Sequence, residues 1–253
     1  MKFPRFPALA LAALMGLHAP VANAASESSA FSDSQKQEIG TIVRSYLLDH
    51  PEVLVEVMQE LDKRQKAENE SKASDAIAKN ASQLYKSPAD FVGGNVKGDV
   101  TIVEFFDYQC GYCRAAAEPL QQATSDDGHV RVIFKEFPIL GPASVTASRA
   151  AIASIRQNKY MPFHMALLHR KGPLTDDIIF TVARDNGIDV AKLKKDMEDP
   201  SVMDTIKGNY ELARTLQVDG TPAFIIGNEL VPGAIGADEM RKHIDAARAS
   251  QKS

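Results

Sequence analysis

The chain has 253 residues, of which 44% are hydrophobic and 25% are charged. This is the composition of an ordinary globular protein, and it argues against a disordered or fibrous chain. The formal net charge is −4, which does not suit nucleic acid or an anionic membrane surface as a partner.

The N-terminus has the pattern of a secretory signal peptide. Lys2 and Arg5 precede an apolar run over residues 8–17, and Ala22-Asn23-Ala24 is a small-x-small cleavage site. A retained anchor is the weaker alternative, because the run is shorter than the roughly 20 residues that a membrane-spanning helix needs. We predict a signal peptide over residues 1–24, cleavage after Ala24 and export to an oxidising compartment, the periplasm.

Residues 25–86 are predicted to be helical. Ser32 and Gln35 have the spacing of a capping box, and Pro51 suits the first turn of a second helix. From residue 62 to residue 81 the composition is polar and alanine-rich, which predicts a long solvated helix.

The two predicted helices carry an apolar stripe at helical spacing. Its members are Ile39, Val43, Tyr46, Leu47, Val53, Leu54, Val57, Met58 and Leu61. A segment of about 50 residues is too small to form its own core, so the stripe must pack on the rest of the chain or on copies of itself. We favour self-association through residues 33–85, as a homo-oligomer that is a dimer or a trimer.

Two cysteines stand where a predicted strand meets a predicted helix. Five of the six residues from Thr101 to Phe106 are β-branched or aromatic, and residues 114–118 favour a helix. The first turn of a helix offers unpaired N–H groups and the positive end of its dipole, which favour a thiolate over a thiol. We therefore expect Cys110 to be the exposed, attacking sulfur and Cys113 to be the less accessible, resolving thiol.

Other uses of the two cysteines have less support. A disulfide that closes a loop of four residues contributes only roughly 2 kcal/mol of stability, and a closed zinc site needs four ligands. We expect redox chemistry with no cofactor besides the Cys110–Cys113 disulfide itself. Binding of a soft ion such as Cu(I) by Cys110 and Cys113 stays open as an alternative.

Two motifs together resemble the DsbA-type branch of the thioredoxin superfamily. They are Phe105-Phe106-Asp107-Tyr108-Gln109-Cys110-Gly111-Tyr112-Cys113 and Gly220-Thr221-Pro222-Ala223-Phe224. The preceding helical extension resembles that of the oligomeric ScsC-like and Com1-like members. The resemblance implies an α/β thioredoxin fold over residues 87–253, with an inserted helical subdomain over about 142–217.

The resemblance also implies functional residues. Gly111-Tyr112 is similar to the dipeptide of periplasmic disulfide isomerases rather than to the Pro-His of strongly oxidising DsbA enzymes. Thr221-Pro222 resembles the cis-proline loop of the superfamily, which faces the active-site sulfurs and pairs with the substrate backbone. Substrate binding is therefore expected at Gly111, Tyr112, Thr221 and Pro222.

An isomerase that acts on disulfides of exported proteins is the predicted function. A dithiol oxidase is the nearest alternative, and a Cu(I)-handling protein is a more distant one. The expected partners are exported protein substrates and a membrane redox protein that recycles the cysteines.

Glu104 and Lys135 are charged residues on strands that otherwise look apolar. Because buried charges are rarely left unpaired, we expect the two to approach each other beneath Cys113 and to relay its proton. The alternative is a solvated glutamate and a lysine at a strand end.

Overall fold

The computed structural model describes residues 31–251, so the predicted signal peptide and its cleavage after Ala24 lie outside the described residues. The chain divides into two compact units, Met1–Glu60 and Leu61–Ser253. In the described residues, no helix has the length and apolar character needed to cross a membrane.

The first unit contains α1 (Asp33–Asp49) and the beginning of α2 (Glu52–Lys79). The predicted capping box is confirmed, since the Oγ of Ser32 accepts from the N–H of Gln35 at 3.3 Å and the N–H of Ser32 donates to the Oε1 of Gln35 at 2.8 Å. The predicted second helix is confirmed, and it begins at Glu52, so that Pro51 directly precedes its first turn. No residue of α1 is buried.

The second unit is built on a five-stranded sheet with the order β1-β3-β2-β4-β5. The strands are β1 (Phe91–Gly94), β2 (Val100–Phe106), β3 (Val130–Glu136), β4 (Ala223–Ile226) and β5 (Glu229–Pro232). β2 and β3 are parallel and are joined by α4 (Gly111–Asp127), and the predicted passage from a strand to a helix at the cysteines is confirmed. The other pairs in the sheet are antiparallel.

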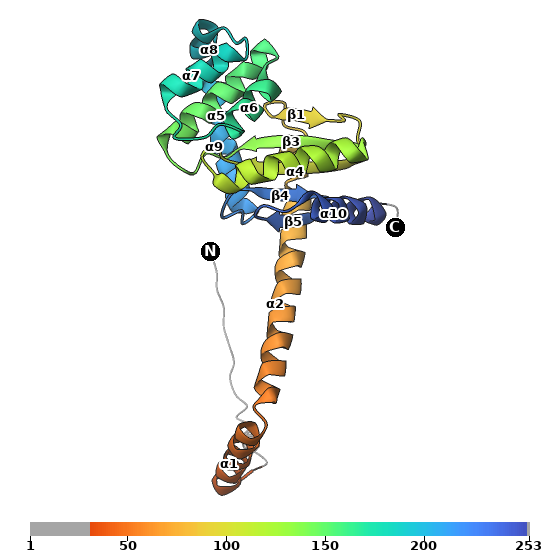
Figure 1. The fold of residues 1–253 in the computed structure, drawn as a ribbon. Helices are drawn as coiled ribbons and strands as arrows, with labels where there is room; N and C mark the ends of the chain where they lie inside the picture. Colours follow the sequence, from red (N-terminus) through yellow and green to blue (C-terminus); the bar gives the residue numbers. More distant parts are fainter. Residues whose placement is uncertain (1–30, 252–253) are drawn as a thin grey trace, which may run out of the picture. The chain divides into compact units, whose positions relative to one another are not determined.

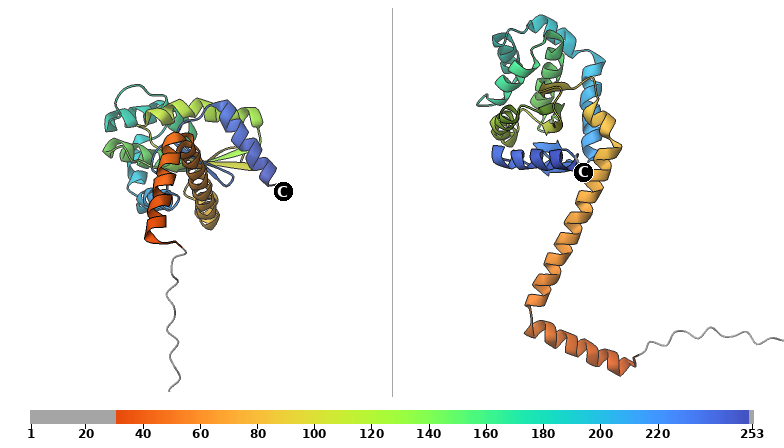
Figure 2. Two further views of the ribbon diagram at one scale, coloured as in Figure 1. Left: turned by 90° about the horizontal axis from the view of Figure 1, so that it is seen from below. Right: turned by 90° about the vertical axis from the view of Figure 1, so that its right-hand side faces the viewer.

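Helices cover both faces of this sheet (Figure 1). On one face, Leu120 of α4 and Ile244 of α10 (Ala237–Ser250) share a buried cluster with Phe106 of β2. On the other face, the last turns of α2, the short helix α3 (Ala81–Tyr85) and the end of α9 (Pro200–Thr215) pack on Phe105. The right-hand view of Figure 2 shows α9 and the last turns of α2 side by side.

The predicted helical insertion is confirmed between β3 and β4. Its helices are α5 (Pro142–Ser154), a 3₁₀ turn (Ile155–Gln157), α6 (Tyr160–Leu168), α7 (Asp176–Asp185), α8 (Val190–Met197) and α9. Helices α5 to α8 gather on one side of the domain in Figure 1. Small residues of α5, including Ala147 and Ala151, are fully buried, which lets neighbouring helices approach closely.

The start of the packed domain differs from the predicted boundary after Lys86. Ile77 and Leu84 are 1% and 0% exposed and belong to the buried cluster beneath the sheet. Tyr85 is also held there, since its hydroxyl donates to the carbonyl of Gly227 at 2.9 Å. The end of the predicted solvated helix is therefore part of the domain, because its few apolar side chains complete the core.

Candidate active site

Cys110 and Cys113 lie at the N-terminus of α4, beside the loop that precedes β4. Cys110 is the N-cap of α4, and its sulfur accepts from the N–H of Cys113 at 3.2 Å. The Cys110 thiol donates to the carbonyl of Thr221 at 3.1 Å. The Thr221–Pro222 peptide bond is cis. The predicted placement of this bond against the sulfurs is thus confirmed.

The two sulfurs differ in accessibility in the expected order, although both are buried. Cys110 is 5% exposed and Cys113 is 0% exposed. The expectation that Cys110 is exposed is wrong for this structure, because the Thr221–Pro222 loop lies against its sulfur. Tyr112 is 72% exposed, so the dipeptide between the cysteines presents a large side chain to an approaching chain.

Burial raises the pKa of the Cys113 thiol far above its usual range. The backbone of Asp107 opposes this shift, whereas Cys110 and the charge of Glu104 increase it. A thiol of this kind attacks slowly unless a nearby group accepts its proton.

Glu104 lies on the sheet face that also carries the cysteines. Its neighbours in sequence, Val103 and Phe105, point to the opposite face, since they belong to the other buried cluster. Glu104 is 1% exposed, and its Oε1 has no hydrogen-bond partner. Burial and the nearby charge of Glu136 raise the pKa of Glu104 to about 8. This carboxyl group can exchange a proton near neutral pH.

Lys135 does not lie near Glu104, and the predicted pair between them is wrong. The parallel register aligns Glu104 with Phe134 and Lys135 with Phe105. Because side chains alternate along a strand, Glu104 and Lys135 point to opposite faces of the sheet. Lys135 instead forms a buried ion pair with Asp90 and donates to the carbonyl of Gln83 at 2.7 Å.

A buried polar cluster surrounds Glu136 at the end of β3, and sequence analysis missed it. The hydroxyls of Tyr108 and Tyr160 donate to the Oε1 of Glu136 at 3.0 Å and 2.8 Å. The Tyr108 hydroxyl also lies 3.0 Å from the Nδ1 of His164. Burial raises the pKa of Glu136 to about 8, and these hydrogen bonds only partly oppose the shift. Burial lowers the pKa of His164 to about 3, so its imidazole is neutral.

Asp107 fastens the segment before Cys110 to the loop after β3. Its Oδ1 accepts from the N–H of Gln109 and from the Oγ of Ser144, each at 2.7 Å. Its Oδ2 accepts from the N–H of Leu140 at 2.9 Å. These bonds position the start of α4, and hence the sulfur of Cys110.

Metal ligands do not gather in the part of the chain that the structure describes. Over residues 31–251, no three or more His, Cys, Asp and Glu side chains come together as a metal-binding group.

Two family models match the chain. The DsbA-like thioredoxin domain matches residues 101–245, which is more than half of the chain. The N-terminal domain of the copper resistance protein ScsC matches residues 35–68.

Solved structures of related proteins support both matches. A thioredoxin-like oxidoreductase from Silicibacter pomeroyi DSS-3 is 40% identical, with a TM-score of 0.66, over 67% of this chain and 98% of its own. BcfH from Salmonella enterica Typhimurium is 28% identical, with a TM-score of 0.73, over 85% of this chain and 96% of its own. A linker-deletion mutant of Proteus mirabilis ScsC is 25% identical, with a TM-score of 0.67, over 88% of this chain and 99% of its own.

Curated relatives include longer proteins. The Na⁺/H⁺ antiporter NhaA 3 of Salinispora tropica is 24% identical over 165 residues, which are 64% of this chain but only 25% of the antiporter. The chain thus spans about a quarter of the length of that relative. The thiol:disulfide interchange protein DsbA of Bordetella pertussis is 25% identical over 165 residues, which are 63% of this chain and 78% of that protein. With the cysteine pair and the cis-proline loop in place, the chain belongs to the DsbA-like thioredoxin family of thiol-disulfide oxidoreductases and carries an ScsC-type N-terminal domain.

Proposed function

We propose that the protein is a periplasmic disulfide isomerase that acts on exported polypeptides. The observation that carries the proposal is the position of the Cys110 sulfur, at the N-terminus of α4 and 3.1 Å from the Thr221 carbonyl of the cis-proline loop. An extended substrate strand that pairs with this loop would bring its disulfide to Cys110.

The exchange begins when the Cys110 thiolate attacks one sulfur of a substrate disulfide. A bond forms between Cys110 and that sulfur, the substrate S–S bond breaks, and the second substrate sulfur leaves with the electron pair as a thiolate. In isomerisation, a substrate thiolate then attacks the mixed disulfide, which forms a new substrate disulfide and releases Cys110. Gly111 and Tyr112 lie beside the bound chain, together with Thr221 and Pro222.

Cys113 provides the escape route from a mixed disulfide that does not rearrange. Its thiolate attacks Cys110, which forms the Cys110–Cys113 disulfide and releases the substrate sulfur as a thiolate. Because burial raises the pKa of Cys113, this attack needs a proton acceptor, and we assign that role to Glu104. A slow escape suits an isomerase, since the substrate has time to rearrange.

The first unit supports assembly into a homo-oligomer within residues 33–85. The exposed apolar stripe would form the contact, because Ile77 and Leu84 are already buried in the domain. Ile39, Val43 and Tyr46 of α1 are 43%, 50% and 54% exposed, and the stripe continues through the beginning of α2 at Leu54 and Met58. Pairing of these faces in a dimer or trimer would remove them from water. Several catalytic domains in one assembly would also raise the effective concentration of Cys110 at a bound substrate.

The redox state of the cysteines tests this proposal in cells. An isomerase needs a reduced Cys110, so trapping with an alkylating reagent should find Cys110 and Cys113 mainly as thiols, maintained by a membrane reductant. The purified protein should also reactivate a scrambled multi-disulfide substrate, and the Cys110→Ser variant should not. Cysteines found mainly as a disulfide, without reactivation, would favour the dithiol oxidase.

Cu(I) binding is a second candidate, favoured by one observation. The family model that matches residues 35–68 is described as the N-terminal domain of a copper resistance protein. Cys110 and Cys113 would supply the sulfur ligands. Thiolates suit Cu(I). Titration of the reduced protein with Cu(I) against a competing chelator tests it, with the variant that lacks both cysteines as control. Equal retention of copper by the two proteins would exclude the cysteine pair as the site.

A further inference from the structure

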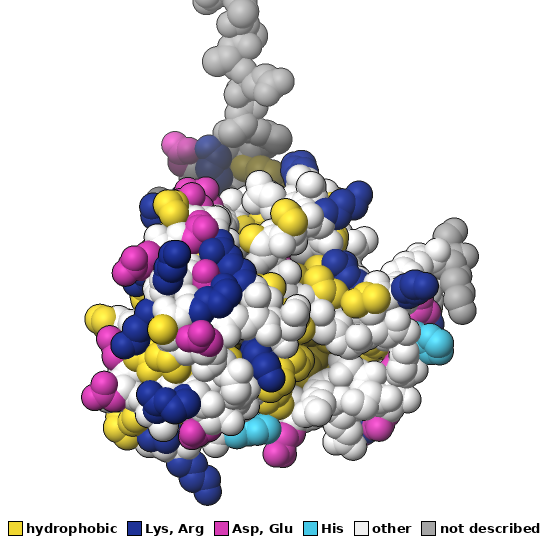
Figure 3. Space-filling model, turned by 90° about the horizontal axis from the view of Figure 1, so that it is seen from above, with side chains coloured by type: hydrophobic (Ala, Val, Ile, Leu, Met, Phe, Trp, Pro, Cys, Tyr) yellow, Lys and Arg dark blue, Asp and Glu magenta, His cyan; other side chains and the backbone are white. Residues whose placement is uncertain are grey.

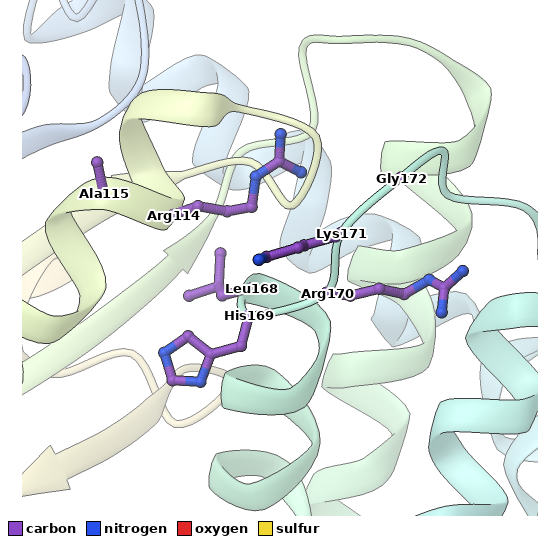
Figure 4. A pocket seen from close by; sticks show the side chains of 7 residues that line it. All are labelled: Arg114, Ala115, Leu168, His169, Arg170, Lys171 and Gly172. Atoms are coloured by element: carbon purple, nitrogen blue, oxygen red, sulfur yellow. The ribbon is translucent and has the colours of Figure 1, made fainter.

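A hollow with cationic walls lies beside the first turns of α4. It has a volume of about 480 Å³ and is lined by Arg114, which follows Cys113 in the chain, and by the segment after α6. In Figure 4, the ammonium of Lys171 extends toward the space between Arg114 and His169, with Leu168 behind it, whereas Arg170 points away. Arg114 and Lys171 thus both border the hollow, and no acidic residue lines it.

Three arginines of the same domain have their charge paired with aspartates within the chain. Arg156, Arg241 and Arg248 each pair with aspartates at 3.0 Å or less. Within residues 31–251, neither Arg114 nor Lys171 has a carboxylate partner. On the face shown in Figure 3, Lys and Arg side chains are more numerous over the half that carries the helical insertion. The cations beside α4 are therefore available for an anion from outside the chain.

A second hollow lies between Arg114 and Gln109, the residue before the reacting cysteine. It has a volume of about 310 Å³ and is lined by Gln109, Arg114 and the turn that contains Gly172, Pro173 and Leu174. Gln109 directly precedes Cys110. Because Arg114 lines both hollows, a chain that enters beside Cys110 and passes Gln109 meets Arg114 next.

We propose that Arg114 and Lys171 bind acidic side chains of the substrate polypeptide, close in sequence to the cysteine that reacts with Cys110. The inference rests on the proposed function and adds a substrate class, namely acidic segments around a disulfide. A guanidinium holds a carboxylate through two parallel hydrogen bonds, whereas the more flexible lysine supplies a point charge. Leu168 offers an apolar surface to the carbon stem of the bound side chain.

A polypeptide fits this surface better than a small anion does. The two hollows share Arg114 and together extend from the residue beside Cys110 to His169. A free anion would occupy only one of them, while an extended segment can place its cysteine at Cys110 and its acidic residue at Arg114.

Binding is measured first, with the reduced full-length protein and peptides that cannot react. Two peptides with a neutral fluorescent label and serine in place of cysteine differ only in glutamate or glutamine at the neighbouring positions. Anisotropy should show about threefold to tenfold tighter binding of the glutamate peptide, the range for a partly exposed charge pair. The preference should disappear at 1 M salt, where charges are screened within about 3 Å.

Variants assign the preference to the pocket. Arg114→Gln should remove most of it, Arg114→Lys should restore part, and Lys171→Gln in the exposed segment should reduce it without altering α4. Lys195→Gln, an exposed lysine of α8 that does not line the hollows, should keep the full preference. Equal binding of the two peptides, or an undiminished preference in both Arg114→Gln and Lys171→Gln, would overturn the proposal.

Two further measurements distinguish a polypeptide ligand from a small one, and failure of the binding proposal from failure of the proposed function. S-methylglutathione carries the carboxylates of glutathione but cannot exchange. If it competes as strongly as the glutamate peptide, the pocket takes small glutathione-type anions and the polypeptide assignment is overturned. The same peptides with a cysteine, joined by a disulfide to a neutral thiol, report exchange with Cys110. If neither peptide reacts, the proposed function fails. The binding data still show whether Arg114 and Lys171 bind acidic side chains.

Discussion

The two units of the chain differ in how far their apolar side chains are exposed to solvent. In α1, Ile42 and Leu48 are 61% and 67% exposed, whereas Val103 and Phe105 of β2 are fully buried. Burial of one such side chain contributes roughly 1.5 to 3 kcal/mol. The redox domain gains this within a single chain, and α1 does not. The domain therefore completes its own core, while α1 leaves its apolar side chains exposed within the single chain.

Charged residues differ between the two units in the same sense. Asp33, Lys36 and Glu52 of the first unit remain well exposed, whereas Glu104 and Glu136 of the domain are 1% and 2% exposed. Burial of a charge is costly unless it is paired or neutralised. The domain therefore holds buried groups with perturbed proton equilibria, and two of them, Glu104 and Glu136, lie on the face that carries the cysteines.

Loss of a cysteine should have the largest effect, because it removes the chemistry from the domain and leaves both cores intact. Cys110→Ser should abolish exchange with protein disulfides. Cys113→Ser should instead accumulate mixed disulfides with substrates, since the escape route is closed. Non-reducing gels after acid quenching measure both. Equal accumulation in the two variants would contradict the assigned roles.

Disruption of the apolar stripe should impair assembly while the chemistry of the redox domain is retained. Val43→Glu places a charge on the exposed face of α1, and burial of that charge in an oligomer is unfavourable. We expect sedimentation to show a smaller species, with most isomerase activity lost and reduction of a small disulfide retained. Gln37→Glu, on another face of α1, should change neither. A wild-type monomer, or full isomerase activity in dissociated Val43→Glu, would contradict the role of the helices.

Loss of Asp90 should test how the domain tolerates a buried charge. Burial raises the pKa of Asp90 and lowers the pKa of Lys135, and the attraction between the two opposes both shifts. Asp90→Ala leaves the buried charge of Lys135 unpaired, so we expect the free energy of unfolding to fall by about 3 to 5 kcal/mol. Chemical denaturation measures the loss.

Two comparisons decide whether that loss comes from the stranded charge. Adding Lys135→Met to Asp90→Ala should recover most of the stability, because no unpaired charge then remains. Asp204→Ala, at an exposed position of α9, should change the free energy of unfolding by about 0.5 kcal/mol or less. A double variant as unstable as Asp90→Ala would assign the loss to packing.

The sequence predicted the elements of the domain well, because the signals are local. The β-branched and aromatic residues from Thr101 to Phe106 predicted a strand, and residues 114–118 predicted the helix that follows the cysteines. The cis bond before Pro222 was predicted through family resemblance.

Contacts between strands were harder to predict, since they depend on register. An offset of one residue between β2 and β3 would have placed Glu104 and Lys135 on the same face. The observed register places Glu136, rather than Lys135, on the face of Glu104. Asp90 is 45 residues from Lys135 in sequence, in a segment with no regular pattern, so nothing local indicated the pair.

The smallest expected effect, and the sharpest test of the buried acids, is that of Glu104→Gln. The pKa of Glu104 is raised from 4.5 to about 8 in the folded protein. Between these values the unfolded chain releases the proton while the folded protein keeps it, so the contribution of Glu104 to stability is full below pH 4.5 and falls as the pH rises to about 8.

Glu104→Gln should therefore stabilise the protein at pH 8 by about 1 to 3 kcal/mol, with little change at pH 4. The dependence of stability on pH should weaken but persist, because Glu136 also has a raised pKa.

The same variant should slow the attack of Cys113 on the mixed disulfide, most clearly near pH 8, where Glu104 accepts a proton in the wild type. Rapid acid quenching after single-turnover mixing measures this rate. Glu118→Gln, on the exposed side of α4, should match the wild type in both properties. If Glu104→Gln is more stable at pH 8 but Cys113 attacks the mixed disulfide at the wild-type rate, Glu104 has a raised pKa but is not the proton acceptor for Cys113.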